Sequence, residues 1–224
     1  MNGRDLVLGS IRRSLGVSGS EAPRRTVTGE RLARHPRGIV PERGAQPPRR
    51  RVNLFRAMLA EASGTTEEVA TLEDVPAAVA AYLRSKNLPQ SIRRGGDPLL
   101  ASIPWDREGT LEVTTGRSDG NQLASVSHAF RGVAETGTLV LTSGSDNPTT
   151  LNFLPEHHIV VLEAKDIVGD YESVWDALRK KVGAKVPRTV NWITGASRSA
   201  DIEQVLLNGA HGPKGLHVIV VGKP

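Results

Sequence analysis

Two short and nearly unbroken hydrophobic runs constrain the fold of this chain more than any other feature of its sequence. Residues 159–162 have the sequence Ile-Val-Val-Leu, and residues 217–221 have the sequence His-Val-Ile-Val-Val. A strand that exposes one face to water alternates polar and apolar residues, whereas a strand covered on both faces does not. Helices that cover both faces of a sheet usually connect parallel strands. The two runs therefore predict an α/β fold with a mainly parallel sheet and helices on both faces.

Further segments fit the same architecture. Short apolar runs bounded by turn residues predict strands at 99–103, 111–115, 138–142, 190–194 and 216–221. Apolar residues at intervals of three and four predict helices over 3–15, from Phe55, after Asp74 and over 171–182. A chain of 224 residues is long enough to bury a core without a disulfide or a structural metal. We expect one α/β domain with an appendage at its start.

The appendage differs from the rest of the chain in charge and composition. Residues 1–51 carry 12 basic and 4 acidic residues, a net charge of +8, while residues 52–224 carry 17 basic and 20 acidic residues. After the first helix, residues 16–51 lose helical periodicity and are rich in Gly, Pro, Ser and Arg, which predicts an extended arm. We therefore divide the chain into an N-terminal helix with a basic extended arm, residues 1–51, and an α/β domain, residues 52–224. The arm is expected to dock on the body or on a neighbouring subunit of a homo-oligomer.

Several functions are disfavoured by what the sequence lacks. The chain has no Cys, which removes thiol nucleophiles and iron–sulfur clusters held by thiolates. The longest apolar runs are far shorter than the ~20 residues of a membrane span, and the first residues lack the character of a signal peptide, so we expect a cytoplasmic protein that binds no membrane. Motifs typical of dinucleotide-binding, P-loop, zinc-protease and α/β-hydrolase proteins are missing. The histidines lack the spacing of metal ligands, so no bound metal is expected.

Residues 190–210 form the first candidate site. Their pattern predicts a strand, a turn and then a helix over 200–208, because Ile202, Val205 and Leu206 have helical spacing. A helix N-terminus offers unpaired N–H groups and a partial positive charge, which suit a phosphate or carboxylate. The alternative is that a serine of the turn only caps the helix. The polar and turn-forming residues at this position are Gly195, Ser197, Arg198 and Ser199.

Residues 132–141 form the second candidate site. Two short strands flank the turn at Thr136 and Gly137, where glycine supplies a positive φ, so Glu135 is presented at the turn. Its carboxylate suits the role of acid, base or acyl acceptor, and the hydroxyls of Thr136 and Thr138 suit a polar ligand. The alternative is a solvated carboxylate without a chemical role. His211 follows the predicted helix and either reaches the first site or interacts as a cation with the helix end.

Both candidate sites resemble sequence blocks of a known family. The first block is Ala134-Glu135-Thr136-Gly137-Thr138, followed by an apolar strand. The second is Gly195-x-Ser197-x-x-Ala200-Asp201-Ile202-Glu203, which closes with Gly209-x-His211-Gly212-Pro213. Together they resemble the two signature blocks of the LUD domain, the lactate-utilisation protein C family. Residues 11–16 also resemble the start of members of that family, and the segment 16–51 is the part that the resemblance constrains least.

The resemblance implies a fold similar to the sugar-phosphate isomerase and CoA-transferase group. It also implies partnership with two iron–sulfur proteins that oxidise L-lactate to pyruvate, so that this chain binds no cofactor itself and the clusters belong to its partners. The positions that match the family blocks form a candidate pocket for a small anionic metabolite. These positions are Glu135, Thr136, Gly137, Thr138, Ser197, Asp201, Glu203 and His211.

Three functions are compatible with these features. The first is an accessory or ligand-binding subunit of lactate oxidation, which predicts association with iron–sulfur proteins. The second is a free-standing enzyme on a phosphorylated or CoA-linked organic acid, with Glu135 as nucleophile or base. The third is nucleic-acid binding through the arginine-rich arm, which is disfavoured because no aromatic residue precedes Phe55 to stack on bases.

Overall fold

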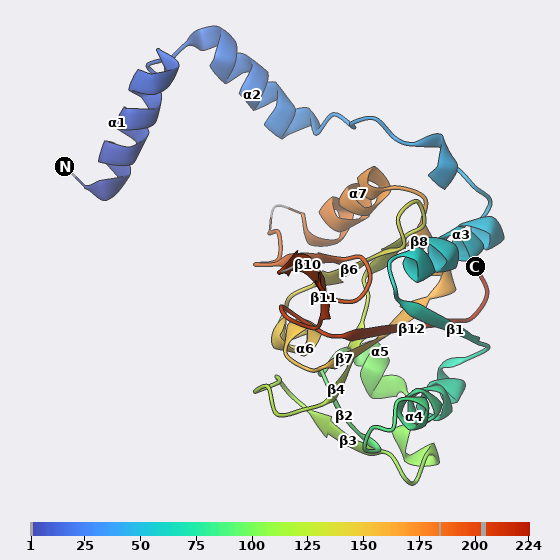
Figure 1. The fold of residues 1–224 in the computed structure, drawn as a ribbon. Coiled ribbons are helices and arrows are strands. Elements are labelled where there is room, and N and C mark those ends of the chain that lie inside the picture. Colours follow the sequence, from blue (N-terminus) through green and yellow to red (C-terminus); the bar gives the residue numbers. More distant parts are fainter. Residues whose placement is uncertain (1, 184, 203–204) are drawn as a thin grey trace. The chain divides into compact units, whose positions relative to one another are not determined.

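The computed structural model describes residues 2–183, 185–202 and 205–224, which form two compact units, Met1–Ile39 and Val40–Pro224 (Figure 1). The first unit contains helices α1 (Gly3–Leu15) and α2 (Ala22–Arg34). Helix α1 was predicted, whereas α2 lies in the segment that we expected to be extended. Neither helix buries a residue, so local propensity accounts for α2: Pro23 suits the first turn and arginine is a good helix former.

Six parallel strands form the main sheet of the second unit, in the order β1-β12-β7-β4-β2-β3. Their bounds are β1 Thr65–Val69, β2 Ser91–Arg94, β3 Glu112–Thr115, β4 Ala124–His128, β7 His157–Glu163 and β12 Gly215–Val221. Strands β7 and β12 contain the two hydrophobic runs and pair along their whole length at the centre of the sheet. The prediction of a parallel sheet is confirmed.

A second, smaller sheet was not predicted. It has the strand order β8-β5-β6-β9, and β6 pairs antiparallel with both β5 and β9. Its strands are β5 Arg131–Val133, β6 Thr138–Thr142, β8 Ile167–Val168 and β9 Val190–Ile193. The predicted strand at 190–194 therefore exists as β9, but it belongs to this sheet and not to the parallel one.

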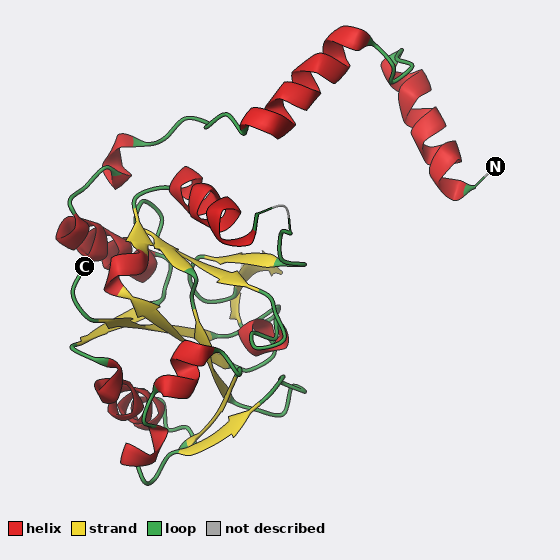
Figure 2. Ribbon diagram, turned by 180° about the vertical axis from the view of Figure 1, so that it is seen from behind, coloured by secondary structure: helices red, strands yellow, loops and turns green. Residues whose placement is uncertain are grey.

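Helices and the small sheet cover the two faces of the main sheet (Figures 1 and 2). One face packs against α4 (Val75–Ser85) and α5 (Pro98–Ser102), and the other packs against α3 (Pro48–Glu61) and the small sheet. Helix α7 (Tyr171–Val182) covers the far side of the small sheet, and α6 (Thr150–Phe153) leads into β7. Single-turn 3-10 helices occupy Glu42–Gly44, Leu72–Asp74, Trp105–Arg107 and Ala164–Asp166.

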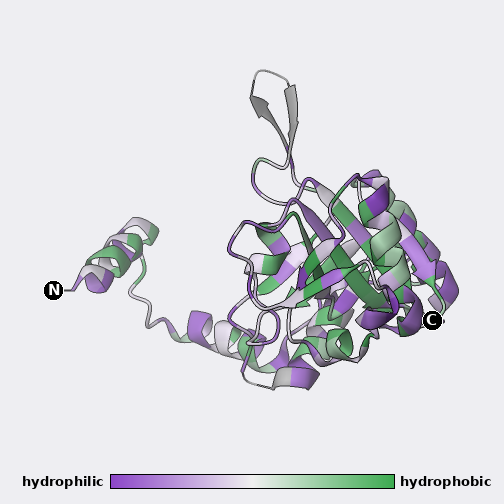
Figure 3. Ribbon diagram, turned by 90° about the horizontal axis from the view of Figure 1, so that it is seen from below, coloured by the Kyte–Doolittle hydropathy of each residue, from purple (hydrophilic) through white to green (hydrophobic). Residues whose placement is uncertain are grey.

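Alternate residues of each central strand supply the two halves of the core. Ile159 and Val161 of β7 pack in the cluster with α4, while Val160 and Leu162 pack in the cluster with α3. All four are fully buried. Figure 3 shows the consequence, because the strands at the centre of the body are largely green and the surrounding helices carry purple as well.

One predicted strand is a helix. Residues 99–103 were expected to be extended, but Pro98–Ser102 form α5. The carboxylate of Asp97 accepts hydrogen bonds from the N–H groups of Leu99 and Leu100, and Pro98 follows it in the first turn. An N-cap and a proline at the first position start a helix, and these two residues outweigh the short apolar run.

Candidate functional site

The helix predicted over 200–208 is a β-hairpin. Strands β10 (Arg198–Ile202) and β11 (Val205–Asn208) pair antiparallel, with Ile202 opposite Val205. A short apolar run fits a helix or a strand by spacing alone, and here the residues with helical spacing are cross-strand neighbours. The prediction of an anion site at a helix N-terminus is therefore wrong in its structural basis, because the Gly195 turn leads into a strand.

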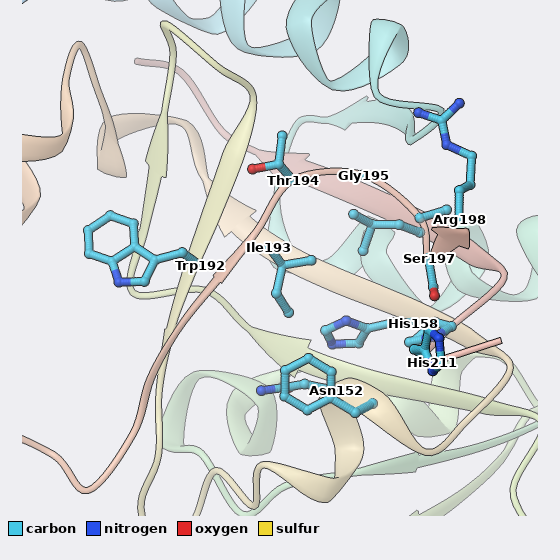
Figure 4. Close-up of a pocket in the computed structure, with 14 residues that line it drawn as sticks. Asn152, His158, Trp192, Ile193, Thr194, Gly195, Ser197, Arg198 and His211 are labelled. Atoms are coloured by element: carbon cyan, nitrogen blue, oxygen red, sulfur yellow. The ribbon is translucent and has the colours of Figure 1, made fainter. Parts of the chain in front are cut away.

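The turn nevertheless lines a cavity of about 360 Å³, which we call the His158 cavity (Figure 4). Of the predicted site residues, the structure brings Gly195, Ser197, Arg198 and His211 to its wall. The wall is completed by the end of α6, the start of β7, the end of β9 and the loop before β12. The remaining lining residues are Asn152, Phe153, His158, Trp192, Ile193, Thr194, Ala196, Gly212, Pro213 and Leu216.

Backbone hydrogen bonds hold the cavity wall together. The N–H of Ser197 donates to the carbonyl of Pro213 at 2.8 Å, and the N–H of Gly209 donates to the carbonyl of Ser197 at 2.9 Å. In Figure 4 the Ser197 hydroxyl points toward His211, and the Arg198 guanidinium points away from both. The side chains of Ser197 and His211, and not the backbone N–H of Ser197, are thus the groups that this segment offers to a ligand.

His158 is the site residue that the sequence analysis missed. Its side chain is 1% exposed, and neither ring nitrogen has a hydrogen-bond partner among the described residues. Burial lowers the pKa of His158 to about 3, so the imidazole is neutral at physiological pH. The sequence feature that could have identified His158 is its position as a polar residue at the start of an otherwise apolar, fully covered strand.

Asn152 contributes a second buried polar group to the same cavity. It is 6% exposed, and its side-chain oxygen accepts a hydrogen bond from the Ser127 hydroxyl at 3.0 Å. This bond orients the amide within the wall. The His158 cavity therefore combines an amide, a hydroxyl and two imidazoles, which can donate to and accept from a small polar ligand.

Glu135 is buried and not presented at the turn as predicted. Its side chain is 3% exposed, and its Oε2 atom has no hydrogen-bond partner among the described residues. Burial raises the pKa of the Glu135 carboxyl. The N–H of Tyr171 and the charge of Arg43 act in the opposite direction without cancelling the effect of burial.

A cluster of hydroxyl groups lies beside Glu135 and links the two candidate blocks. The Thr138 hydroxyl lies 2.8 Å from that of Tyr171 and 2.5 Å from that of Thr194, and the Thr136 hydroxyl lies 2.7 Å from that of Thr138. Thr194 also lines the His158 cavity. The Glu135 block thus touches the cavity wall through one pair of hydroxyls and does not open into the cavity.

Both predicted glycines have a packing role at the end of α3. Gly137 has φ +67°, as predicted, and a Cβ atom there would lie 2.3 Å from the backbone nitrogen of Leu59. Gly195 has φ +81°, and a Cβ atom there would lie 1.9 Å from the carbonyl oxygen of Ala62. Each turn can approach the helix end only because it carries no side chain.

Three predicted residues stay without a described side chain. Ser199 and Asp201 belong to the part of β10 for which only the backbone is described, and Glu203 lies outside the described residues. In the described ranges no group of three His, Cys, Asp or Glu side chains is arranged to hold a metal ion. None of the described helices combines the length and hydrophobicity that crossing a bilayer demands.

Known proteins resemble this chain in sequence and fold. Lactate utilization protein C of Geobacillus thermodenitrificans is 37% identical over 107 residues, which cover 46% of this chain and 45% of that protein. Lactate utilization protein C of Bacillus subtilis is 35% identical over 132 residues, which cover 54% of this chain and 55% of that protein. The chain thus spans about half the length of the curated relatives that it matches.

A solved structure and a family match give the fold and the family of this chain. A crystal structure of a DUF162 family protein from Deinococcus radiodurans aligns with a TM-score of 0.61 and 24% identity, and covers 79% of this chain and 99% of that chain. That likeness shows a shared fold. Residues 53–221, most of the chain, match the LUD domain family, and the chain therefore belongs to that family.

Proposed function

We propose that this protein is a component of L-lactate utilisation in the cytoplasm that binds a small anionic metabolite in the His158 cavity. The observation that carries the proposal is the imidazole of His158, which is buried in the cavity wall without a partner among the described residues. About nine in ten buried polar groups are hydrogen-bonded, and an unsatisfied one costs about 1–3 kcal/mol. A ligand that bonds to His158 removes that cost.

The chemistry of the wall indicates the class of ligand. His158 is neutral and can give or take one hydrogen bond, while Ser197 and Asn152 add a hydroxyl and an amide. Arg198 lines the exposed edge of the cavity with its guanidinium turned away from Ser197 and His211, so a rotation of this side chain would bring its positive charge to a bound carboxylate or phosphate. The relatives named lactate utilization protein C suggest an organic acid of lactate metabolism.

We propose further that the chain acts as an accessory subunit beside iron–sulfur proteins, and helix α1 supports this role. Apolar side chains on one face of it are exposed to solvent, with Val7 60%, Ile11 48% and Leu15 65% exposed. An apolar stripe of this kind is typical of a helix that docks on another protein. These exposed residues favour a protein partner over nucleic acid for the N-terminal unit.

Binding experiments test the cavity. L-lactate, pyruvate and inorganic phosphate are titrated into the full chain by calorimetry and by thermal melting. We expect at least one of them to bind and to raise the melting temperature, because a ligand of the folded state alone stabilises it. Ser197→Ala and His158→Leu should abolish this binding, and the exposed Ser102→Ala serves as control. Equal binding by all variants would exclude the His158 cavity.

Experiments in cells test the metabolic role and the partners. A tagged copy purified from its host during growth on L-lactate should recover iron–sulfur proteins, and Leu15→Arg should reduce that recovery. Deletion of the gene should slow growth on L-lactate and leave growth on glucose unchanged. Normal growth on L-lactate in a host without a second copy would refute the assignment.

A second candidate function is supported by Glu135. A buried carboxyl with a raised pKa and an unpartnered oxygen is typical of catalytic groups. In this hypothesis the deprotonated carboxylate attacks the carbonyl of a CoA thioester, the C–S bond breaks, and CoA leaves as a thiolate. Mass spectrometry of the chain after incubation with acetyl-CoA would then detect an acyl adduct on Glu135 that is absent from Glu135→Gln. Glu135, unlike His158, does not line the His158 cavity, so the binding role is the better supported of the two.

A further inference from the structure

A second polar cluster lies at the carboxyl edge of the parallel sheet. Strand β2 is followed by Asp97, and its neighbour β4 ends at His128. The chain connects β2 to β3 on one side and β4 to β7 on the other, so the strand order reverses between β2 and β4. In open α/β sheets the crevice outside the carboxyl ends at such a reversal is where ligands bind.

The cluster is organised around the carboxylate of Asp97. Its Oδ1 lies 3.0 Å from Nδ1 of His128, and its Oδ2 accepts a hydrogen bond from the Asn147 amide at 3.2 Å. Burial alone would raise the pKa of Asp97, but the bonds from His128, Asn147 and the backbone outweigh it and lower the pKa to about 2. Asp97 is therefore ionised, and the proton between the two side chains belongs to Nδ1 of His128.

This arrangement leaves the other ring nitrogen of His128 without a partner. A proton on Nδ1 places the lone pair of an uncharged imidazole on Nε2, which then acts as an acceptor. Nε2 is buried, and no described residue donates to it. A buried acceptor beside a cavity requires a donor from outside the protein, either a water or a ligand hydroxyl.

Positively charged side chains also line the same cavity. The guanidinium of Arg131 and the ammonium of Lys181 lie 4.5 Å and 4.8 Å from the centre of the Phe130 ring. Arg131 pairs with Asp166 at 2.7 Å, so Lys181 is the lining cation outside that ion pair. The cavity has a volume of about 270 Å³, and its wall contains these side chains together with Asp97, His128, Thr142 and Asn147.

We propose that this cavity, the His128 cavity, is a separate ligand site for a small hydroxylated anion. The ligand hydroxyl donates to Nε2 of His128, and its carboxylate or phosphate lies beside Lys181. Asp97 is a positioning residue, because it fixes the tautomer that makes Nε2 an acceptor. The two cavities share no lining residue, so the proposal for this site can be tested separately from the proposal for the His158 cavity.

Matched pairs of probes test the proposal in the full-length protein. L-lactate is compared with propionate, and 2-hydroxyethyl phosphate is compared with ethyl phosphate; in each pair the second compound lacks only the hydroxyl. We expect the hydroxylated member of at least one pair to bind about three- to tenfold more tightly, as one hydrogen bond provides. The pair that shows the preference identifies whether the acid group is a carboxylate or a phosphate.

Variants assign the preference to a cavity. His128→Phe should remove the preference for the hydroxyl, whereas Lys181→Gln, at the end of α7, should weaken both members of a pair equally. Ser197→Ala, in the other cavity, reports on any binding there, and the exposed His35→Gln should change neither the preference nor the affinity. If His128→Phe does not fold, long-range ¹H–¹⁵N spectra of the wild type replace this variant. The hydroxylated probe should shift the Nε2 resonance of His128, and the deoxy probe should not.

Two results would overturn the site. One is the absence of any preference for the hydroxylated probes. The other is a preference that survives in His128→Phe, and it can be followed further in Ser197→Ala, which would then lose the preference if it arises in the other cavity. That loss would support the His158 cavity, so failure of this site and failure of the proposed function are distinguishable.

Discussion

The stability of the protein should fall steeply in mild acid because His158 is buried without a partner among the described residues. The pKa of a histidine in the unfolded chain is about 6.5, and in the folded protein that of His158 is about 3. Above pH 6.5 the ring is neutral in both states and pH has no effect through it. Below pH 6.5 the unfolded chain binds a proton that the folded protein rejects, so stability is lost as the pH falls toward 3.

The magnitude follows from these two pKa values. At pH 4.5 protonation of His158 stabilises the unfolded chain by about 3 kcal/mol relative to the folded protein. His217, whose pKa burial lowers to about 4, adds about 2–3 kcal/mol at the same pH. Domains are typically stable by only about 5–15 kcal/mol, so the two residues together remove a large part of the total.

Urea unfolding followed by tryptophan fluorescence at pH 7 and pH 4.5 measures this loss. The variant His158→Leu should lose about 3 kcal/mol less than the wild type between the two pH values. At pH 7 it should differ from the wild type by less than about 1.5 kcal/mol, because an apolar side chain replaces a buried group that makes no hydrogen bond to a described residue. His35→Gln, on the exposed N-terminal unit, is the control. An equal loss in the wild type and His158→Leu would refute the argument.

Two further predictions concern packing and the division into units. Gly195→Ala should lower the free energy of unfolding by at least about 3 kcal/mol, because the new Cβ would collide with the carbonyl of Ala62. Gly222→Ala, which has the same positive φ but open space around it, should cost only about 1–2 kcal/mol in urea unfolding. Deletion of residues 1–39 should leave one cooperative melting transition, shifted by less than about 3 °C in calorimetry. Loss of cooperativity would show that the N-terminal unit belongs to the core.

Local patterns predicted the parts of the fold that their own sequence determines. The hydrophobic runs of β7 and β12 identified the centre of the parallel sheet, and the spacing of apolar residues identified α7 with the bounds that the structure shows. In both cases the pattern of burial follows the periodicity of a single element.

Elements that depend on a partner strand were not predictable in this way. Strand β1 has the sequence Thr-Thr-Glu-Glu-Val, which is polar and shows no fully buried residue, yet it forms because it pairs in parallel with β12. The hairpin of β10 and β11 was mistaken for a helix for the same reason, since its pairing is not visible in the spacing of its residues. The same limit explains why His158 and Asn152 were missed, as both reach the cavity from elements remote in sequence from the Gly195 turn.

The end of helix α3 explains why two blocks that are far apart in the sequence behave as one structural feature. Gly137 contacts the backbone at Leu59, and Gly195 contacts the backbone at Ala62, one turn further along the same helix. With both turns held there, the hydroxyls of Thr138 and Thr194 meet at 2.5 Å. The glycines and threonines of the blocks are therefore accounted for by packing alone. Among the described side chains of the two blocks, packing leaves Glu135 in the first and Ser197 with His211 in the second unexplained, and these retain a claim to ligand chemistry.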